Sequence, residues 1–227
     1  MADSIARNDG MSSTAPGYHD VRFQYDVRRA PVWRQLARYL QRFVDPTGGL
    51  LELGAGYGEF SSVVDAGQKW GLDLNPDLTQ YWSNEVVPLI QSALDPLPLA
   101  DRSVATVFAS NFFEHFVIED AGLILAEAAR VLRPGGKLIA VQPNYRLQPH
   151  RYFDDYTHKQ AYTESSFSDY LTSLGWKVRH CEARFMPFTM KSSLPTWGWL
   201  VAVYLALPYR PLAGQFLIVA EAPEEAR

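Results

Sequence analysis

The sequence has little cysteine, no excess of positive charge and no long uninterrupted apolar run, and each absence excludes a class of protein. The single cysteine, Cys181, allows no internal disulfide and no cysteine-rich zinc motif, so we expect no metal and a reducing, cytoplasmic location. A net charge of −4 at pH 7 does not favour binding to nucleic acid. Prolines and Arg210 interrupt the apolar stretch 194–212, which leaves it too short to cross a bilayer.

What is present indicates one globular domain. Apolar residues make up 47% of the 227 residues and charged residues 20%, which is enough to build a sizeable core. Residues 1–17 are rich in small and polar residues and contain no signal-peptide core, so we expect a flexible tail followed by a single domain at 18–227. The stretch 194–212 is expected to be a buried helix or cap, and contact with lipid or an apolar substrate remains an alternative.

Helical and strand patterns alternate along most of the chain. Such alternation predicts an α/β fold with a largely parallel, doubly wound sheet. The irregular segment 143–163 lies between the last two units, where a long loop is often functional. The expected helices are 29–44, 59–65, 76–82, 118–132 and 165–174, and the expected strands are 49–53, 69–74, 86–90, 104–110, 137–142, 176–184 and 215–220.

A glycine-rich turn joins the first strand to the next unit. Gly54, Gly56 and Gly58 allow the backbone to pass close to a ligand, and Glu52 precedes them on the strand. Asp73 lies seventeen residues after Gly56, at the end of the second strand, where an acid accepts hydrogen bonds from ribose hydroxyls. This combination predicts a site for an adenosine-containing cofactor.

Four motifs in order resemble the class I S-adenosylmethionine-dependent methyltransferases, in the small-molecule, type 11-like branch. The resemblance covers about residues 48 to 220. Its motifs are Glu52-x-Gly54-x-Gly56-x-Gly58, Asp73-Leu74-Asn75, Asn111-Phe112-Phe113-Glu114-His115 after the fourth strand, and the helix that ends at Pro134-Gly135-Gly136.

The resemblance implies a seven-stranded, mostly parallel sheet with an antiparallel last strand, and S-adenosylmethionine as cofactor. It also implies substrate-cap elements at 18–45, 143–163 and 185–212. The backbone of Gly54, Ala55 and Gly56 would lie along the methionine part of the cofactor, with Glu52 and Gly58 nearby. Asp73 would accept hydrogen bonds from the ribose hydroxyls. Leu74, Ala93 and Leu94 would lie at the adenine, although many members of the family have an acid near position 93. Asn111 and Phe112 would lie at the sulfonium.

Methyl transfer from a sulfonium mainly requires alignment, although a hydroxyl acceptor benefits from a base. His158 and Asp155, in the irregular segment, are candidate bases or substrate anchors. His115 is a candidate positioning residue, and a buried structural histidine is the alternative interpretation. The candidate substrate-binding residues are Arg28, Arg146, His150 and Tyr156. The alternative for the arginines is a surface or ion-paired residue, and for the other two it is a solvated loop that caps the site.

The expected function is therefore methyl transfer, at oxygen, to a small molecule, a sugar or a lipid-linked acceptor. Two alternatives stay open. A nicotinamide-dependent oxidoreductase would have a third glycine at position 59, where this chain has Glu59. A non-catalytic member of the fold would keep the cofactor site and act through its apolar 185–212 surface. A homodimer is compatible with the same surface.

Overall fold

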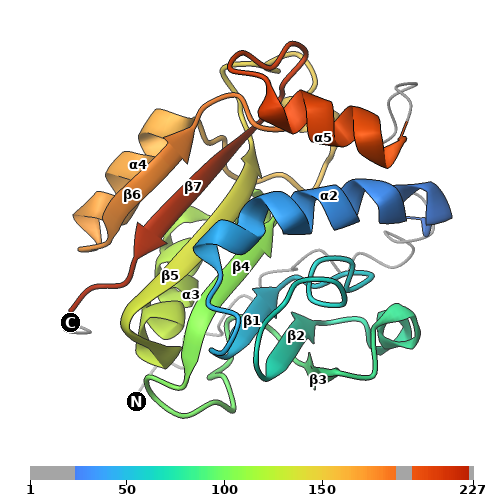
Figure 1. Ribbon diagram of the computed structural model, residues 1–227. Helices are drawn as coiled ribbons and strands as arrows, with labels where there is room; N and C mark the ends of the chain where they lie inside the picture. Colours follow the sequence, from blue (N-terminus) through green and yellow to red (C-terminus); the bar gives the residue numbers. More distant parts are fainter. Residues whose placement is uncertain (1–23, 188–195, 225–227) are drawn as a thin grey trace.

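A computed structural model describes residues 24–187 and 196–224 of the chain. Its centre is one seven-stranded sheet with the strand order β3-β2-β1-β4-β5-β7-β6 (Figure 1). The strands are β1 (Leu50–Leu53), β2 (Lys69–Asp73), β3 (Val86–Ile90), β4 (Val104–Ser110), β5 (Leu132–Pro143), β6 (Lys177–Glu182) and β7 (Gln215–Glu221).

The chain order of the strands reverses beside β1, which pairs with β2 on one side and β4 on the other. All pairs from β3 to β5 are parallel, whereas β7 runs antiparallel to both of its neighbours, β5 and β6. This arrangement confirms the predicted doubly wound, mostly parallel sheet with an antiparallel last strand. Ligands in such sheets bind at the carboxyl ends of the strands, where the order reverses.

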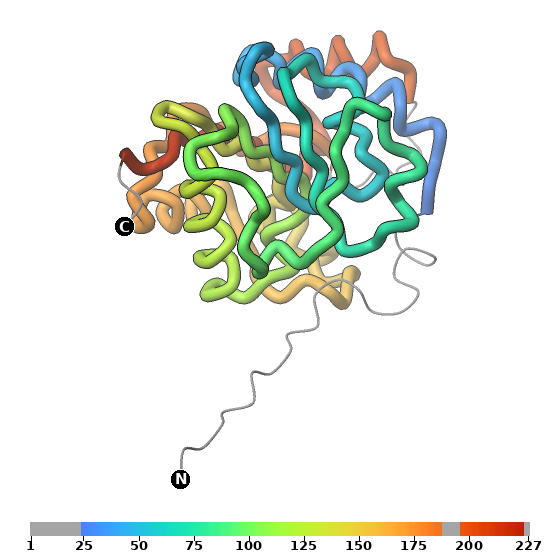
Figure 2. The backbone as a smooth tube through the Cα atoms, turned by 90° about the horizontal axis from the view of Figure 1, so that it is seen from below, coloured from blue at the N-terminus to red at the C-terminus, as the bar shows by residue number. Residues whose placement is uncertain are grey.

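Helices cover both faces of the sheet and create two hydrophobic cores. Helices α2 (Ala30–Leu40) and α5 (Gly198–Ala206) lie side by side on one face, and the two views agree on this (Figures 1 and 2). Helices α3 (Ile118–Val131) and α4 (Glu164–Ser173) pack on the other face. The shorter elements are the 3-10 helices η1 (Val27–Arg29), η2 (Gln41–Phe43), η3 (Pro76–Tyr81), η4 (Phe113–His115) and η5 (Tyr152–Asp154).

The predicted helix 59–65 is wrong, because the chain forms successive turns there. Gly58 has a φ of +64°, and only isolated helical bonds follow, such as Ser62 N–H to the Gly58 carbonyl at 3.0 Å. The Ser61 N–H donates to the Glu52 side chain instead of a preceding carbonyl. A side-chain acceptor therefore takes the place of the helical hydrogen bond.

Two other elements differ in kind or extent from the sequence prediction. The segment 76–82 forms the 3-10 helix η3 rather than an α-helix. Strand β5 begins at Leu132, before the Pro134-Gly135-Gly136 turn, because Leu132 pairs with Val104 and the register resumes at Lys137 opposite Thr106. The turn is thus a bulge within a long strand.

The apolar stretch 194–212 contains α5, which buries Val201 and Leu205 against α2 and exposes several large apolar side chains. Among the described residues, no helix has the length and apolar character that crossing a membrane requires. The predicted tail 1–17 and residues 188–195 of the predicted cap lie outside the described residues.

Candidate functional site

The glycine turn after β1 closes onto the end of β2. Gly54, Gly56 and Gly58 all have positive φ, a conformation that glycine adopts without strain. The Gly56 N–H donates to Asp73 Oδ2 at 2.8 Å, and the Asn75 N–H donates to Oδ1 at 3.0 Å. A carboxylate can accept about four hydrogen bonds, so Asp73 can hold the turn and still accept from ribose hydroxyls.

Glu52 supports the turn from inside the protein. Its side chain is buried, and its Oε2 accepts from the Ser61 N–H at 2.9 Å. Burial raises the pKa of Glu52 to about 8, although the hydrogen bond from Ser61 lowers it. Its position beneath the turn indicates a structural role beside the expected path of the methionine part.

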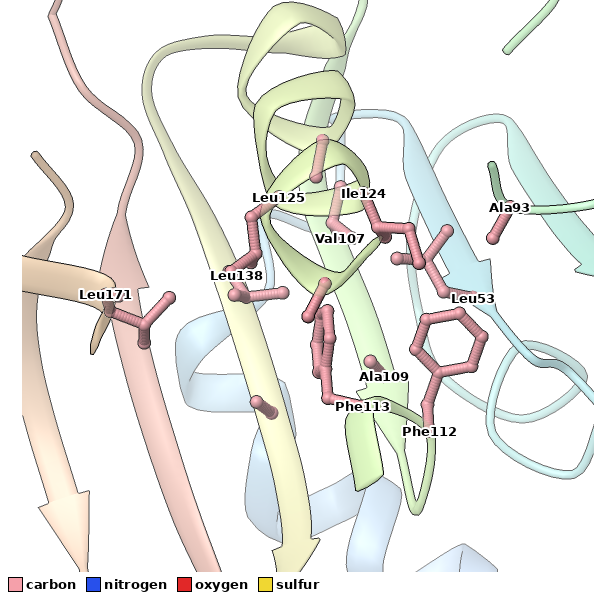
Figure 3. Close-up of a cluster of buried hydrophobic side chains, with 14 of the residues drawn as sticks. Leu53, Ala93, Val107, Ala109, Phe112, Phe113, Ile124, Leu125, Leu138 and Leu171 are labelled. Carbon is pink, nitrogen blue, oxygen red and sulfur yellow. The ribbon is translucent and has the colours of Figure 1, made fainter. Parts of the chain in front are cut away.

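The end of β4 forms the opposite wall of this site. Asn111 has a φ of +48°, and its N–H donates to the Val141 carbonyl at 2.9 Å. The ring of Phe112 turns toward Leu53 and Ala93 (Figure 3). Gln142 accepts from the Phe112 N–H at 3.3 Å, while its buried Nε2 has no hydrogen-bond partner among the described residues. Gln142 therefore presents a donor at this end of β5.

The predicted adenine side is more apolar. Leu74 and Leu94 are half-buried, and Ala93 is buried in the same cluster as Phe112. Trp82 donates from Nε1 to the Gly56 carbonyl at 2.8 Å and so fixes the back of the turn. The first motif did not reveal this role of Trp82, because the residue lies 26 positions further along the chain.

The N-terminal segment touches the glycine turn through aromatic rings. Tyr25 stacks on Tyr81 with ring centroids 4.4 Å apart, and both rings meet Tyr57 edge to face. The predicted substrate residue Arg28 is exposed and binds Asp26, two residues earlier, through both carboxylate oxygens.

A second group of polar side chains lies directly after β4. Glu114 is fully buried, and neither carboxylate oxygen has a hydrogen-bond partner among the described residues. Its Oε1 lies 4.0 Å from His115 Nε2 and 3.9 Å from His158 Nε2. Burial raises the pKa of Glu114 to about 8 and, with His158, lowers the pKa of His115 to about 4. Two predicted catalytic histidines are thus brought together.

The third predicted catalytic residue, Asp155, belongs to the same group. Its Oδ1 accepts from the Thr157 hydroxyl at 2.6 Å, and that hydroxyl oxygen lies 2.9 Å from His115 Nδ1. Because the Thr157 hydroxyl donates to Asp155, its oxygen can accept a hydrogen bond from an N–H at His115 Nδ1.

The three predicted substrate residues of the segment 143–163 are exposed. Arg146 forms an ion pair with Glu164 at 3.3 Å. His150 and Tyr156 are exposed. Glu114 and Thr157 are the polar residues that sequence reasoning did not assign, although the Glu114-His115 pair after the fourth strand carried a signal for the first of them.

Comparisons with known proteins agree with this geometry. Residues 51–140 match a methyltransferase-domain family. A malonyl-[acyl-carrier protein] O-methyltransferase of Methylococcus capsulatus is 30% identical over 183 residues, which are 74% of this chain and 64% of that protein. A ubiquinone/menaquinone biosynthesis C-methyltransferase of Chromobacterium violaceum is 24% identical over 174 residues, which are 69% and 70% of the two chains.

Solved structures share the fold. One chain of the Haloferax volcanii complex between the Trm112 methyltransferase activator and a methyltransferase superposes with a TM-score of 0.65 at 20% identity, covering 86% of this chain and 92% of that one. This chain spans slightly less than two thirds of the O-methyltransferase relative. The segment that matches the methyltransferase-domain family contains the glycine turn, Asp73 and the end of β4, and the solved structures show that the fold of this chain is the one found in S-adenosylmethionine-dependent methyltransferases.

Proposed function

We propose that this chain binds S-adenosylmethionine and transfers its methyl group to a small-molecule acceptor. The observation that carries the proposal is the turn Gly54–Gly58 closed by Asp73 at the point where the strand order reverses. In the proposed complex Gly54, Ala55 and Gly56 pass the methionine part, and Asp73 accepts from the ribose hydroxyls. The adenine lies among Leu74, Ala93 and Leu94, and the sulfonium faces Asn111 and Phe112.

Oxygen is the proposed site of methylation. In the transfer, the sulfur–methyl bond breaks as the oxygen–methyl bond forms, and sulfur keeps the bonding electron pair to become a neutral thioether. The hydroxyl proton must leave, and His115, which shortly follows Phe112 in the chain, lies with His158 and Asp155 in a group that can supply acid–base side chains. One relative is an O-methyltransferase and another is a C-methyltransferase, so the relatives do not decide which atom is methylated. The proposal of oxygen therefore rests on the side chains of this chain alone.

The proposed acceptor is a small molecule, free or attached to a sugar or lipid, with Arg28, Arg146, His150 and Tyr156 as candidate contacts. A lipid-linked form is favoured by the exposed apolar side chains on and beside α5, which include Trp197 and Trp199. We propose that this surface touches a membrane peripherally. The cytoplasmic location and the homodimer remain predictions from the sequence.

The test is calorimetric titration of the purified chain with S-adenosylmethionine, its demethylated product and NADH. We expect micromolar binding of the sulfonium and its product, and none of NADH. Asp73→Ala should weaken this binding at least tenfold, while Asp77→Ala, an exposed acid in the following turn, should leave it unchanged. Binding of NADH alone would instead identify a nicotinamide-dependent protein.

A second measurement separates binding from transfer. Radiolabelled methyl groups from S-adenosylmethionine should move to hydroxyl-containing acceptors in a metabolite extract. Cofactor binding without transfer to any acceptor would favour the non-catalytic member of the fold.

A further inference from the structure

The fully buried carboxyl group of Glu114 and two largely buried imidazoles converge beside the carboxyl end of β4, and the binding of the cofactor does not require them. Glu114 and His115 belong to η4, and His158 belongs to the segment after η5. One donor atom from each lies within 4.8 Å of the other two. The rings of His115 and His158 are inclined by 70°, with centroids 5.1 Å apart. The two rings are therefore not stacked, and the Nε2 atom of each lies near Glu114 Oε1.

The distances between the Glu114 carboxylate and the two imidazoles fit a cation bound between these groups better than a direct hydrogen bond. The distances of 3.9 and 4.0 Å from Glu114 Oε1 to the two Nε2 atoms exceed hydrogen-bonding range. Ligands at about 2.0–2.1 Å around a tetrahedral cation stand roughly 3.3 Å apart. Small rotations of the three side chains would bring Glu114 Oε1 and the two Nε2 atoms from 3.9 and 4.0 Å to this ligand–ligand distance.

The environment of the Glu114 carboxyl group independently indicates a bound ligand. A fully buried carboxyl group with no hydrogen bond to either oxygen is costly, and native proteins usually compensate such a group. The compensation can be a proton or a cation, and the two imidazoles beside it are the ligands that complete a cation site.

The backbone holds this arrangement in place. The N–H groups of Lys159 and Gln160 both donate to the Glu114 carbonyl, at 2.8 and 3.1 Å, so the segment that carries His158 is fixed to η4. The hydrogen-bonded series Asp155–Thr157–His115 orients the His115 ring, and its Nε2 lies 4.0 Å from Glu114 Oε1. A hydrogen bond of this kind behind a histidine is the usual support of a metal ligand.

We propose that Glu114, His115 and His158 bind one divalent transition-metal cation, with zinc as the first candidate. Two nitrogen ligands and one carboxylate suit zinc or cobalt and disfavour magnesium and calcium, which prefer oxygen. Three protein ligands leave a coordination position open. In an extension that rests on the proposed function, the acceptor hydroxyl binds there and releases its proton to water more readily, and His115 and His158 act as metal ligands in place of the acid–base role given above.

The test is metal titration of tag-free, chelator-treated full chain in the absence of S-adenosylmethionine and acceptor. We expect one Zn²⁺ or Co²⁺ per chain, and visible absorption bands for the cobalt form. Mg²⁺ should compete weakly or not at all. Glu114→Gln and His158→Asn should each weaken binding by at least about tenfold. His180→Asn, at a histidine of β6 that lies outside the cluster and pairs with Glu182, is the matched control and should bind the metal as the wild type does.

Thr157→Val tests the support of His115 without touching a ligand. It should weaken metal binding by about tenfold while the stoichiometry stays at one. Binding of S-adenosylmethionine by each variant shows that it is folded. A wild-type chain that binds S-adenosylmethionine but no transition metal would overturn the metal site alone, as would metal affinity unchanged by Glu114→Gln and His158→Asn. Metal binding without cofactor binding would overturn the proposed function alone.

Discussion

Phe112 lies so close to Gly54 that a β-carbon on Gly54 would come within 2.6 Å of Phe112 Cδ2. The two residues follow β4 and β1, the neighbouring strands at which the sheet reverses its order. The close approach means that the glycine turn and the wall after β4 fit one another only because position 54 has no side chain. A substitution there should move both sides of the proposed cofactor site.

Gly54→Ala is therefore expected to weaken S-adenosylmethionine binding at least tenfold and to destabilise the chain by about 2–4 kcal/mol, from a positive φ and a steric clash together. Gly135→Ala is the matched control, because Gly135 has a φ of +73° and a β-carbon added there would meet nothing within 4 Å. It should cost only about 1–2 kcal/mol and leave cofactor binding unchanged. Calorimetry and urea unfolding measure the two effects. Equal losses in the two variants would contradict the role of Phe112.

Glu52 should make stability depend on pH. Its pKa rises from 4.5 to about 8 on folding because the side chain is buried, so its stabilising contribution is complete below pH 4.5 and is lost as the pH rises toward 8. The free energy of unfolding should fall across this range by at most about 1.4 kcal/mol per pH unit from this group.

Glu52→Gln removes this titration but keeps a carbonyl that accepts from the Ser61 N–H. Glu59, whose pKa burial raises to about 7, titrates in the same range, so the informative quantity is the difference between the two proteins. Urea unfolding at pH 5, 6.5 and 8 in the presence of chelator should show the wild type losing its advantage as the pH rises. Parallel curves would mean that Glu52 is not buried as described.

The sequence predicted the sheet well because each strand is a short apolar run between turn residues. The runs at β4 and β7 are almost entirely buried and unambiguous, and Asp73 stood at the end of the second strand as expected. Residues 59–65 were mistaken for a helix because the local pattern cannot show that Glu52 accepts a backbone hydrogen bond there. The bulge at Pro134-Gly135-Gly136 was missed for a related reason, since it depends on pairing with β4.

The candidate site also has one part that the sequence predicted and another that only the fold brings together. The glycine turn and Asp73 are close enough in sequence to be recognised as one motif. His115 and His158 were chosen separately, and only the fold places both against Glu114. Thr157 had no sequence signal, because a hydroxyl between an acid and a histidine acquires its role through geometry alone.

A partly buried ionic network should contribute to the stability of the α2–α5 face. Arg210 donates to Glu182 and, at 2.9 Å, to the Tyr39 hydroxyl, which itself donates to Glu182 at 2.6 Å. The network joins α2, β6 and the segment after α5. Arg210→Ala leaves Glu182 without its main counter-charge and should lower the free energy of unfolding by about 3 kcal/mol.

Arg179→Ala is the control for this network, because Arg179 pairs with Glu221 at an exposed position. Its loss should cost less than about 1 kcal/mol. Urea unfolding of both variants beside the wild type gives the comparison. Similar small losses in both would show that the Glu182 carboxylate is compensated by other groups.

The outward side of α5 and the residues flanking it should bind a lipid surface. Trp197 and Trp199 are 61% and 63% exposed and lie nearly parallel, with ring centroids 6.0 Å apart. Tryptophan is favoured at membrane interfaces because its ring is apolar while its N–H can bond to headgroups or water. Val201 and Leu205 already anchor the helix to the protein, so the outward side chains are available for a second surface.

The measurement is co-flotation of the purified chain with phosphatidylcholine vesicles and with vesicles that also contain phosphatidylglycerol. The wild type should float with both, since the contact is apolar and the chain has a net charge of −4. Trp197→Ser combined with Trp199→Ser should reduce the vesicle-bound fraction severalfold. Leu123→Ser is the matched control: Leu123 is 64% exposed on α3, on the opposite face of the sheet, and its loss should change nothing. A wild-type chain that stays in the soluble fraction with both vesicles, or a tryptophan variant that floats as well as the wild type, would reject the membrane contact and favour a free small-molecule acceptor.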